Sequence, residues 1–349
     1  MRKYWGTVVG IVISLAALAF AVKGIPPAEL GKALSGANYW FVIPAALVLF
    51  LAFVTRAIRW RGLLRAQVPL GEVFHALNAG YLLNNTLPLR LGELGRAYLL
   101  SRSKTVGGAE ALSTIIIERL LDLLMTAVIL AITLPLVAAA AWVQSAGLTV
   151  GAMGIVGFAA LVIFAHHRSR LLALGNRGIG RLPRLNTLLA RWLVRADSFL
   201  SGLEILRDFR QLAIAIFWSL ITWTCSAIVS WLLLCSFIPR PSFVVALFAL
   251  GVGALGYAVP SSPGQAGVYE AAIVAALVPL GVARSSAFSY AVVVHVLNYA
   301  LVGLLGGWAL SQYGETLAGL ARSAQTFLAK APGEAAADSL NRQDAKPAK

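Results

Sequence analysis

The stretch NNTLPLRLGELGRAYLL, residues 84–100, interrupts a segment that is otherwise apolar. The whole segment, residues 72–103, is apolar up to Leu83, is then broken by polar residues and a proline, and continues with charged residues. The residues that mark the break and the start of the next run are Asn84, Asn85, Pro88, Arg90, Gly92, Glu93 and Arg96. Proline and glycine end helices, so the pattern predicts a helix, a break and a second helix.

A second stretch has the same order of features. It reads PSSPGQAGVYE, residues 260–270, inside a longer apolar segment over residues 243–280. Pro260 and Gly264 are four residues apart, as are Pro88 and Gly92 in the first stretch. Both segments therefore predict two helices joined by a proline and glycine break with an acidic residue after it.

The composition places these segments in a membrane. Hydrophobic residues make up 59% of the 349 residues and charged residues 12%, and the mean hydropathy is +0.80. A soluble domain averages about a quarter charged residues, so much of this surface must face lipid. The fold class predicted is an all-α polytopic membrane protein with about six transmembrane helices and two re-entrant helical hairpins.

Six apolar stretches are long enough for spanning helices, which need about 20 apolar residues. They cover residues 5–22, 39–55, 112–136, 148–164, 212–237 and 287–310. The first could instead be a cleaved signal peptide, because Ala19, Phe20 and Ala21 supply a small-x-small cleavage site.

The net charge of +15 could indicate nucleic-acid binding, but the basic residues lie between apolar stretches, as in cytoplasmic loops. With both termini in the cytoplasm, the basic residues left outside are Lys23, Lys32, Arg240 and Arg284. The predicted location is therefore the bacterial inner membrane, with anionic phospholipid headgroups as partners and no nucleic acid.

Two segments are predicted to lie outside the bilayer. Residues 166–210 are rich in arginine with apolar residues at helical spacing, which indicates a cytoplasmic amphipathic helix or a solvated linker helix. Residues 313–349 show little periodicity and are predicted to be a disordered cytoplasmic tail. A single transmembrane domain is expected over residues 1–312.

The two broken segments are too short to cross twice, so each is expected to be a re-entrant hairpin. The helices flanking the first hairpin run in directions opposite to those flanking the second, which predicts an inverted-topology repeat with one hairpin entering from each face. Interrupted helices at matching positions of two halves are the usual location of a transporter's binding site. The alternative is a pair of kinked structural helices.

The first stretch, together with IIIERLLDLL over residues 115–124, resembles the signature of the lysylphosphatidylglycerol synthase transmembrane-region family, also called the flippase-like domain family. The second stretch is similar to that family's Pro-x-x-Pro-Gly motif. The resemblance covers residues 5–313 and implies a lipid transporter that works by alternating access, without the soluble synthase domain. It also implies a separate lipid-synthesising enzyme as a possible partner, and a homo-oligomer is possible.

The charged residues near the first break are candidates for binding a headgroup. Arg90 and Arg96 could hold a lipid phosphate, since guanidinium pairs with phosphate oxygens bidentately, or could anchor the interface. Glu93 could pair with either arginine or with a cationic headgroup. Asn84 and Asn85 could bind a headgroup, although satisfying the broken backbone is the preferred role for Asn85.

Three further candidates lie on one helix, where Glu118 and Asp122 share a face and Arg119 can pair with Asp122. Their charges need partners away from lipid, so this helix is expected to face the first hairpin. In the second hairpin, Gln265 and Glu270 are candidates, and Glu270 could carry a coupling proton or cap the following helix. His295 and Tyr299 are four residues apart and are explained equally well by core hydrogen bonding.

The sequence offers little for an enzyme. It has no phosphate-binding loop, HExxH motif or nucleophile elbow, and no cofactor or metal is expected. Cys225 and Cys235 are about 15 Å apart along a helix, too far for a disulfide. A membrane-embedded glycosyl or lipid transferase, or an accessory subunit of envelope biosynthesis, is the alternative function, because a few carboxylates such as Glu93, Glu118 and Asp122 could serve it.

Overall fold

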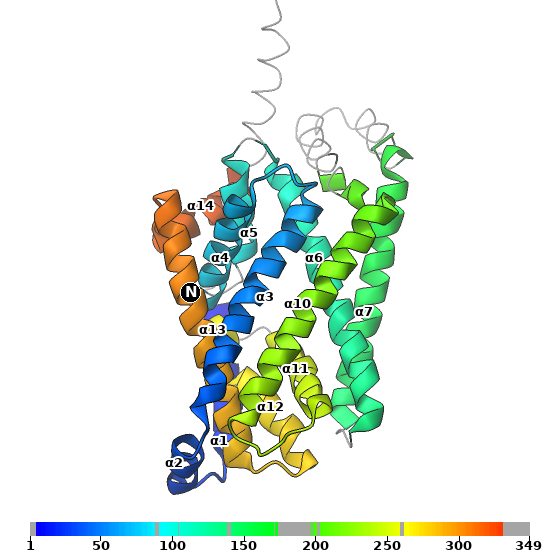
Figure 1. Cartoon of the computed structure of the whole chain (residues 1–349). Coiled ribbons are helices and arrows are strands. Elements are labelled where there is room, and N and C mark those ends of the chain that lie inside the picture. The colour runs from blue at the N-terminus through cyan, green and yellow to red at the C-terminus, as the bar shows by residue number, and fades with distance from the viewer. Residues whose placement is uncertain are drawn as a thin grey trace, which may run out of the picture.

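A computed structural model describes most of the chain, and all regular structure in the part it describes is helical. The described residues are 5–87, 91–103, 105–137, 141–170, 172–173, 197, 199–200, 203–258 and 262–330. Figure 1 shows a single elongated bundle of helices.

The first half of the chain contains seven α-helices and two short 3₁₀ helices among the described residues. They are α1 (Trp5–Val22), α2 (Pro27–Ser35), η2 (Tyr39–Phe41), α3 (Val42–Leu63), α4 (Leu70–Thr86), α5 (Gly92–Ser101), α6 (Gly108–Thr133), η4 (Leu134–Leu136) and α7 (Ala141–His166). The second half continues with η6 (Leu203–Arg207), α10 (Phe209–Cys235), α11 (Phe243–Ala258), η7 (Pro263–Gln265), α12 (Val268–Leu277), η8 (Val278–Leu280), α13 (Arg284–Tyr313) and α14 (Leu317–Lys330).

Four of these helices are long and apolar enough to cross a membrane. They are Tyr39–Leu63, Gly147–His166, Phe209–Cys235 and Arg284–Tyr313. A fifth candidate is the pair formed by α1 and α2, which is bent by 83°. Large apolar side chains on these helices are exposed, as expected of surfaces that face lipid rather than water. The chain is therefore a multi-pass membrane protein.

Each of the six predicted apolar stretches falls on a helix. Two of these helices do not meet the spanning criterion by themselves. The helix α1 meets it only together with α2, and α6 is long enough at 26 residues but carries Glu118, Arg119 and Asp122 in its middle. A count of six spans remains a prediction.

Both broken segments form a helix, a break and a second helix, as predicted. In the first, α4 ends at Thr86, α5 begins at Gly92, and the two helices pack against each other. In the second, α11 and α12 pack together on either side of a break that contains η7. The first hairpin lies toward one end of the bundle and the second toward the other (Figure 1).

The arrangement of helices has a regular pattern of neighbours. The helices α3 and α10 pack side by side along the middle of the bundle (Figure 1). On one side α4 packs against α13, and correspondingly α11 packs against α6. The second helix of each hairpin packs on the long helix that follows it in the chain, α5 on α6 and α12 on α13.

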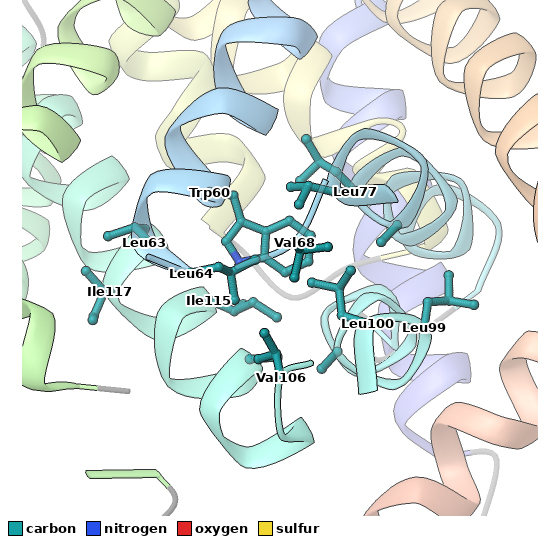
Figure 2. Close-up of a cluster of buried hydrophobic side chains, with 14 of the residues drawn as sticks. Trp60, Leu63, Leu64, Val68, Leu77, Leu99, Leu100, Val106, Ile115 and Ile117 are labelled. Carbon is teal, nitrogen blue, oxygen red and sulfur yellow. The ribbon is translucent and has the colours of Figure 1, made fainter. Parts of the chain in front are cut away.

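The core around the first hairpin is built from large apolar side chains and from glycines that let two helices approach closely. Figure 2 shows Trp60 of α3 at the centre of a cluster that includes Leu77 and Leu100. Between α4 and α5 the backbones approach so closely that a Cβ at Gly92 would lie 2.0 Å from the carbonyl oxygen of Gly80. Only glycine permits this contact, and it fixes α5 against α4.

The helix α1 packs along α12 of the second hairpin. The Ser14 hydroxyl of α1 accepts a hydrogen bond from the Ser262 N–H at 3.0 Å. At the end of α1, the Arg284 guanidinium donates to the carbonyl oxygen of Phe20 at 2.7 Å. The first helix of the chain is thereby joined to the second hairpin and to α13.

The predicted disorder from residue 313 onward is wrong for residues 317–330, which form α14. Leu320, Ala321 and Ala324 are buried where α14 packs on α5, and Tyr98 contacts Phe327 at 6.0 Å between ring centroids. These apolar residues recur at helical spacing, but most are small, so the periodicity is weak in sequence. Residues 331–349 lie outside the described residues.

The predicted amphipathic helix of residues 166–210 lies mostly outside the described residues. Within the part that is described, Leu203, Ile205 and Leu206 of η6 are buried. The Arg168 guanidinium forms an ion pair with Asp197. The packing of η6 on α7 and α10 attaches the end of the segment to the bundle, and the ion pair joins the start of the segment to Asp197.

Candidate functional site

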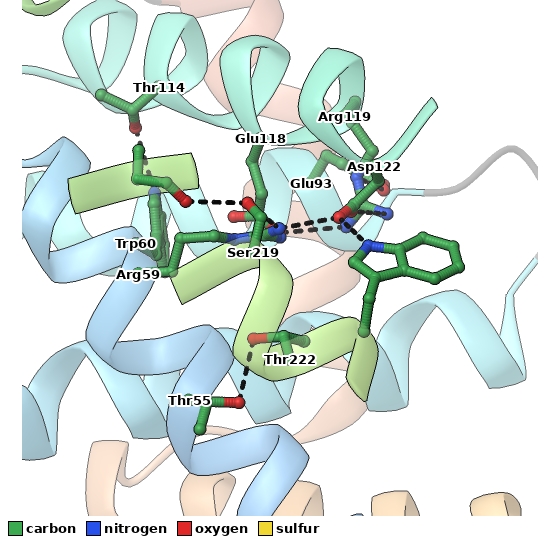
Figure 3. Close-up of polar contacts among 12 residues, drawn as sticks. Thr55, Arg59, Trp60, Glu93, Thr114, Glu118, Arg119, Asp122, Ser219 and Thr222 are labelled. Atoms are coloured by element: carbon green, nitrogen blue, oxygen red, sulfur yellow. Dashed lines mark hydrogen bonds and ion pairs between the residues drawn. The ribbon is translucent and has the colours of Figure 1, made fainter. Parts of the chain in front are cut away.

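Six charged side chains meet where α3, α5, α6 and α10 come together (Figure 3). Three are basic and three acidic, so the group is balanced in charge. We refer to this group as the charge cluster, and its members are Arg59, Glu93, Arg96, Glu118, Arg119 and Asp122.

Arg59 lies at the centre of the charge cluster, with a fully buried side chain. Its Nη1 lies 2.8 Å from Asp122 Oδ1, and the same nitrogen donates to the Ser219 hydroxyl at 3.1 Å. Its Nη2 lies 3.4 Å from Glu118 Oε1. In sequence, Arg59 follows the apolar stretch of residues 39–55 together with Arg56, Arg61 and Arg65, a pattern that predicts a basic cytoplasmic loop. For Arg59 that prediction is wrong, because α3 continues to Leu63 and buries this side chain.

Arg96 joins the first hairpin to α6. Its Nη1 donates to Glu118 Oε2 at 3.1 Å, and its guanidinium carbon lies 4.6 Å from the centroid of the Trp60 ring. The Trp60 indole N–H is held by the Thr114 hydroxyl at 3.0 Å. Arg96 is 1% exposed, so in this conformation it contacts Glu118 and not a lipid headgroup. The prediction that α6 faces the first hairpin is confirmed.

The remaining members form the partly exposed edge of the charge cluster. Arg119 lies 3.8 Å from Asp122 Oδ2, the intrahelical pair expected from sequence, and 3.8 Å from Glu93 Oε1. Glu93 therefore pairs with Arg119 rather than with Arg96. The Arg119 side chain is 40% exposed, which makes this edge the most accessible part of the charge cluster.

Several polar atoms of the charge cluster are buried without a hydrogen-bond partner among the described residues. Arg59 Nε, Arg96 Nη2 and Glu93 Oε2 are such atoms. A buried ion pair is expensive to break because the remaining charge is left uncompensated. The cluster thus holds α3, α5 and α6 together and has spare donors and an acceptor.

The Asn84 side chain bridges the break of the first hairpin by a hydrogen bond to the start of α5. Its Oδ1 accepts a hydrogen bond from the Gly92 N–H, the first residue of α5, at 2.7 Å. From sequence, Asn85 is the preferred residue for this role, but its Nδ2 is buried without a hydrogen-bond partner in the described structure. Arg90 and Pro88 lie outside the described residues.

A second polar site lies at the break of the second hairpin. Glu270 Oε2 accepts a hydrogen bond from the Gly267 N–H at 2.6 Å, so Glu270 caps α12, one of the two roles considered for it. Glu270 Oε1 lies 2.5 Å from His295 Nδ1. The other ring nitrogen, Nε2, lies 2.9 Å from the Gly264 carbonyl oxygen.

The backbone of this break needs its two glycines. Gly264 and Gly267 have φ of 69° and 87°, and a Cβ at Gly264 would overlap the Tyr299 hydroxyl. Gln265 also has a positive φ, 59°, and its side chain is half-buried beside the break. Gln265 lies in η7 next to the Glu270 site, and no hydrogen bond joins the two side chains in the described part of the structure.

A cavity of about 510 Å³ lies against Glu270 and His295. Its walls are otherwise mostly apolar, and Val296 on its rim is 61% exposed. The residues that line it are Ala266, Glu270, Val292, His295, Val296, Tyr299 and Ala300. Within the described ranges, no three His, Cys, Asp or Glu side chains are grouped as a metal site requires.

A bundle of apolar helices, two broken hairpins and a buried charge cluster define a multi-pass membrane protein. Over residues 7–306 the chain matches the family described as lysylphosphatidylglycerol synthase TM region, and it belongs to that family.

Two curated relatives are similar to the chain. It is 27% identical to glycosyltransferase AglD of Haloferax volcanii over 345 residues, which is 86% of this chain and 53% of that protein. It is 32% identical to a UPF0104 membrane protein of Methanothermobacter thermautotrophicus over 125 residues, which is 34% of this chain and 37% of that protein. The chain spans about half the length of the first relative and a smaller share of the second.

Proposed function

We propose that this chain moves a phospholipid or related amphipathic lipid between the two leaflets by alternating access. The observation that carries the proposal is the placement of the two broken hairpins. They lie toward opposite ends of the bundle (Figure 1), and α4 of the first contacts η7 in the break of the second. Broken backbone at membrane depth is tolerated where it is buried in protein or lines a wet cavity, and transporters place their sites there.

The neighbour pattern supports an inverted repeat. In such a repeat α3 corresponds to α10, α4 to α11, α5 to α12 and α6 to α13. When each of these eight helices is replaced by its counterpart, every packed pair among them that is described above becomes another packed pair. On this proposal the first hairpin enters from the cytoplasm and the second from outside. Both termini are then cytoplasmic, in a bacterial inner membrane.

The charge cluster is proposed to meet the headgroup. Arg119, Asp122 and Glu93 are the members with exposed side-chain surface, so they contact it first. Arg96 and Glu118 are buried against each other and become available only when α5 moves relative to α6. The observed conformation then corresponds to a state closed at the first hairpin, and a lipid shifts the population toward an open state.

A second function is favoured by one comparison. The relative from Haloferax volcanii is named a glycosyltransferase, so a membrane-embedded transferase, or a subunit that works with a separate lipid-synthesising enzyme, is the alternative. The carboxylates at the exposed edge of the charge cluster, Glu93 and Asp122, are where such chemistry would take place.

Reconstitution distinguishes the two functions. The purified chain is placed in vesicles that contain a headgroup-labelled lipid, and a membrane-impermeant quencher is added outside. We test labelled phosphatidylglycerol, lysyl-phosphatidylglycerol and an isoprenoid-linked sugar. With a transporter, label from the inner leaflet also becomes quenched for at least one lipid.

The matched variants are Arg119→Gln, which should slow this movement, and Arg102→Ala, which removes an exposed ion pair with Glu315 and should leave it unchanged. Rates equal to those of protein-free vesicles for all three lipids would contradict the proposal. Transfer of a radiolabelled sugar to a lipid acceptor that requires the protein would support the transferase instead.

A further inference from the structure

The Glu270 and His295 side chains form a buried pair that belongs to the second hairpin and to α13. Both residues are 5% exposed. Three contacts at hydrogen-bond distance hold the pair, one between its two members and two to the backbone of the break. The Gly267 N–H donates to Glu270 Oε2 at 2.6 Å, His295 Nδ1 faces Glu270 Oε1 at 2.5 Å, and His295 Nε2 faces the Gly264 carbonyl at 2.9 Å.

These contacts determine where the hydrogens are. A carbonyl oxygen can only accept, so His295 Nε2 must carry a hydrogen toward Gly264. Glu270 Oε2 accepts from the Gly267 N–H, so it carries none. Between His295 Nδ1 and Glu270 Oε1 one hydrogen is required, because without it two lone pairs would face each other. The geometry therefore fits one state, in which the pair holds one shared proton.

We propose that Glu270 and His295 form a proton-binding site that keeps the second hairpin in the observed conformation only while this shared proton is present. Loss of the proton leaves two acceptors opposed at Nδ1 and Oε1. Gain of a second proton puts a donor opposite another donor, either at Nδ1 or at the Gly267 N–H. Either change breaks one of the three hydrogen bonds.

The broken hydrogen bond acts directly on the hairpin. Gly264 and Gly267 are the two glycines of the break with positive φ, and the pair holds one through its carbonyl and the other through its N–H. The histidine belongs to α13, so the pair also holds the break to that helix. Both residues of the pair line the cavity of about 510 Å³, and in this proposal the cavity is the route by which protons reach them.

The groups that face the pair from the surrounding helices are mostly tyrosines. The rings of Tyr257, Tyr269 and Tyr299 lie 6.1, 5.1 and 4.9 Å from the His295 ring. Tyr257 also interacts electrostatically with Arg56 of α3. From α1 the neighbouring group is the Ser14 hydroxyl, which is held by Ser262. The helix α4 contacts η7, and its titratable side chains have other partners. Glu72 interacts with Tyr313, His75 packs on Trp308, and Tyr81 packs on Phe53.

In a lipid transporter this site would make movement of the second hairpin depend on protons from the side that the hairpin faces. That use of the site rests on the proposed function. The proton site itself does not, so it is tested by a structural measurement that needs no lipid movement.

The measurement is amide hydrogen exchange of the full chain in lipid nanodiscs as a function of pH. Protection of residues 262–270 is expressed relative to residues 284–294 of α13, which removes the intrinsic effect of pH on exchange. The relative protection should be highest at intermediate pH and fall on both sides. The fall should be about tenfold, the effect of losing one hydrogen bond to a charged group.

Glu270→Gln gives the sharpest comparison. The glutamine oxygen can still accept from Gly267 and its amide can donate to a neutral His295, so all three bonds form without a shared proton. This variant should stay protected at alkaline pH, where the wild type loosens, and should still loosen at acid pH. His75→Gln, a histidine that packs on Trp308 instead, should keep the wild-type profile.

A wild-type profile without any pH dependence would overturn the proton site, whether or not Glu270→Gln folds. So would a Glu270→Gln profile that keeps the alkaline fall. If the profile behaves as expected but no lipid moves in vesicles, the proton site stands and the transport function fails.

Discussion

Arg59 Nη1 and Asp122 Oδ1 lie 2.8 Å apart and join α3 to α6 in the interior of the bundle. Removing Arg59 takes the nearest cation from Asp122 and leaves the fully buried Glu118 with less positive charge and no replacement from water. We therefore expect Arg59→Met to destabilise the fold by about 3–5 kcal/mol, the range for breaking a buried ion pair from one side.

The matched control for Arg59→Met is Arg102→Ala. Arg102 pairs with Glu315 at 2.7 Å, but its side chain is 46% exposed, so this change should cost only about 0–1 kcal/mol. Unfolding in mixed micelles followed by circular dichroism measures both. Equal stability of the two variants would show that the charge cluster does not hold the helices together.

Asn84 and Asn85 provide a test of the first break. Asn84→Ala removes the acceptor of the Gly92 N–H and should cost about 1–2 kcal/mol, as for other lost helix caps. Asn85→Ala removes a buried amide nitrogen that has no hydrogen-bond partner in the described structure, so it should cost less. Thermal unfolding in detergent compares them, and a larger loss for Asn85→Ala would contradict the assignment.

Gly267→Ala separates close packing from backbone conformation. Gly267 and Gly281 have nearly the same φ, 87° and 84°. An added Cβ at Gly267 would lie 2.2 Å from the Ser14 carbonyl oxygen, whereas at Gly281 nothing lies within 4 Å. The positive φ should strain the alanine at Gly281, which lies in the αL region, by about 1 kcal/mol. It should strain the alanine at Gly267 more, because its ψ of −48° lies outside that region. Only Gly267→Ala should also separate α1 from α12.

The separation of α1 from α12 can be measured by cross-linking. A cysteine pair is placed on α1 and α12 in a variant that lacks Cys225 and Cys235. The yield of the cross-link should fall for Gly267→Ala and stay unchanged for Gly281→Ala. A fall in both would mean that the strain of the backbone alone is responsible.

The topology is tested by cysteine labelling in intact cells, again without the native cysteines. A cysteine at Ser35 or Arg240 should react with a membrane-impermeant reagent from outside, because both lie at the predicted outer end. A cysteine at Arg207 should react only after the membrane is opened. Labelling of Arg207 from outside would contradict the predicted orientation and the inverted repeat.

The helical hairpins could be predicted because proline, glycine and asparagine interrupt apolar runs in a way that few other structures explain. The partner of α6 could be predicted too, since Glu118 and Asp122 share a face and need opposite charges nearby. What could not be predicted was Arg59. In sequence it stands among other arginines at the end of an apolar stretch, and only the packing of α3 against α6 and α10 shows that it points inward.

The second site shows the same limit. Glu270 was a candidate cap from its place after the glycines, but its pairing with His295 depends on how α12 lies against α13, twenty-five residues later in the chain. The tail shows a different limit. Alanines at helical spacing in residues 317–330 give a weak pattern, and the packing of α14 on α5 makes it a helix.

The contact between Ser14 and Ser262 joins residues 248 positions apart, and this has a consequence for biosynthesis. At about 5–20 residues per second, α1 leaves the ribosome roughly 12–50 s before the second hairpin is made. During that interval lipid or an insertion factor must cover the surface of α1 that later packs on α12. The nascent chain therefore waits in the membrane with its first helix unpaired, and closure around that helix is among the last steps of its assembly.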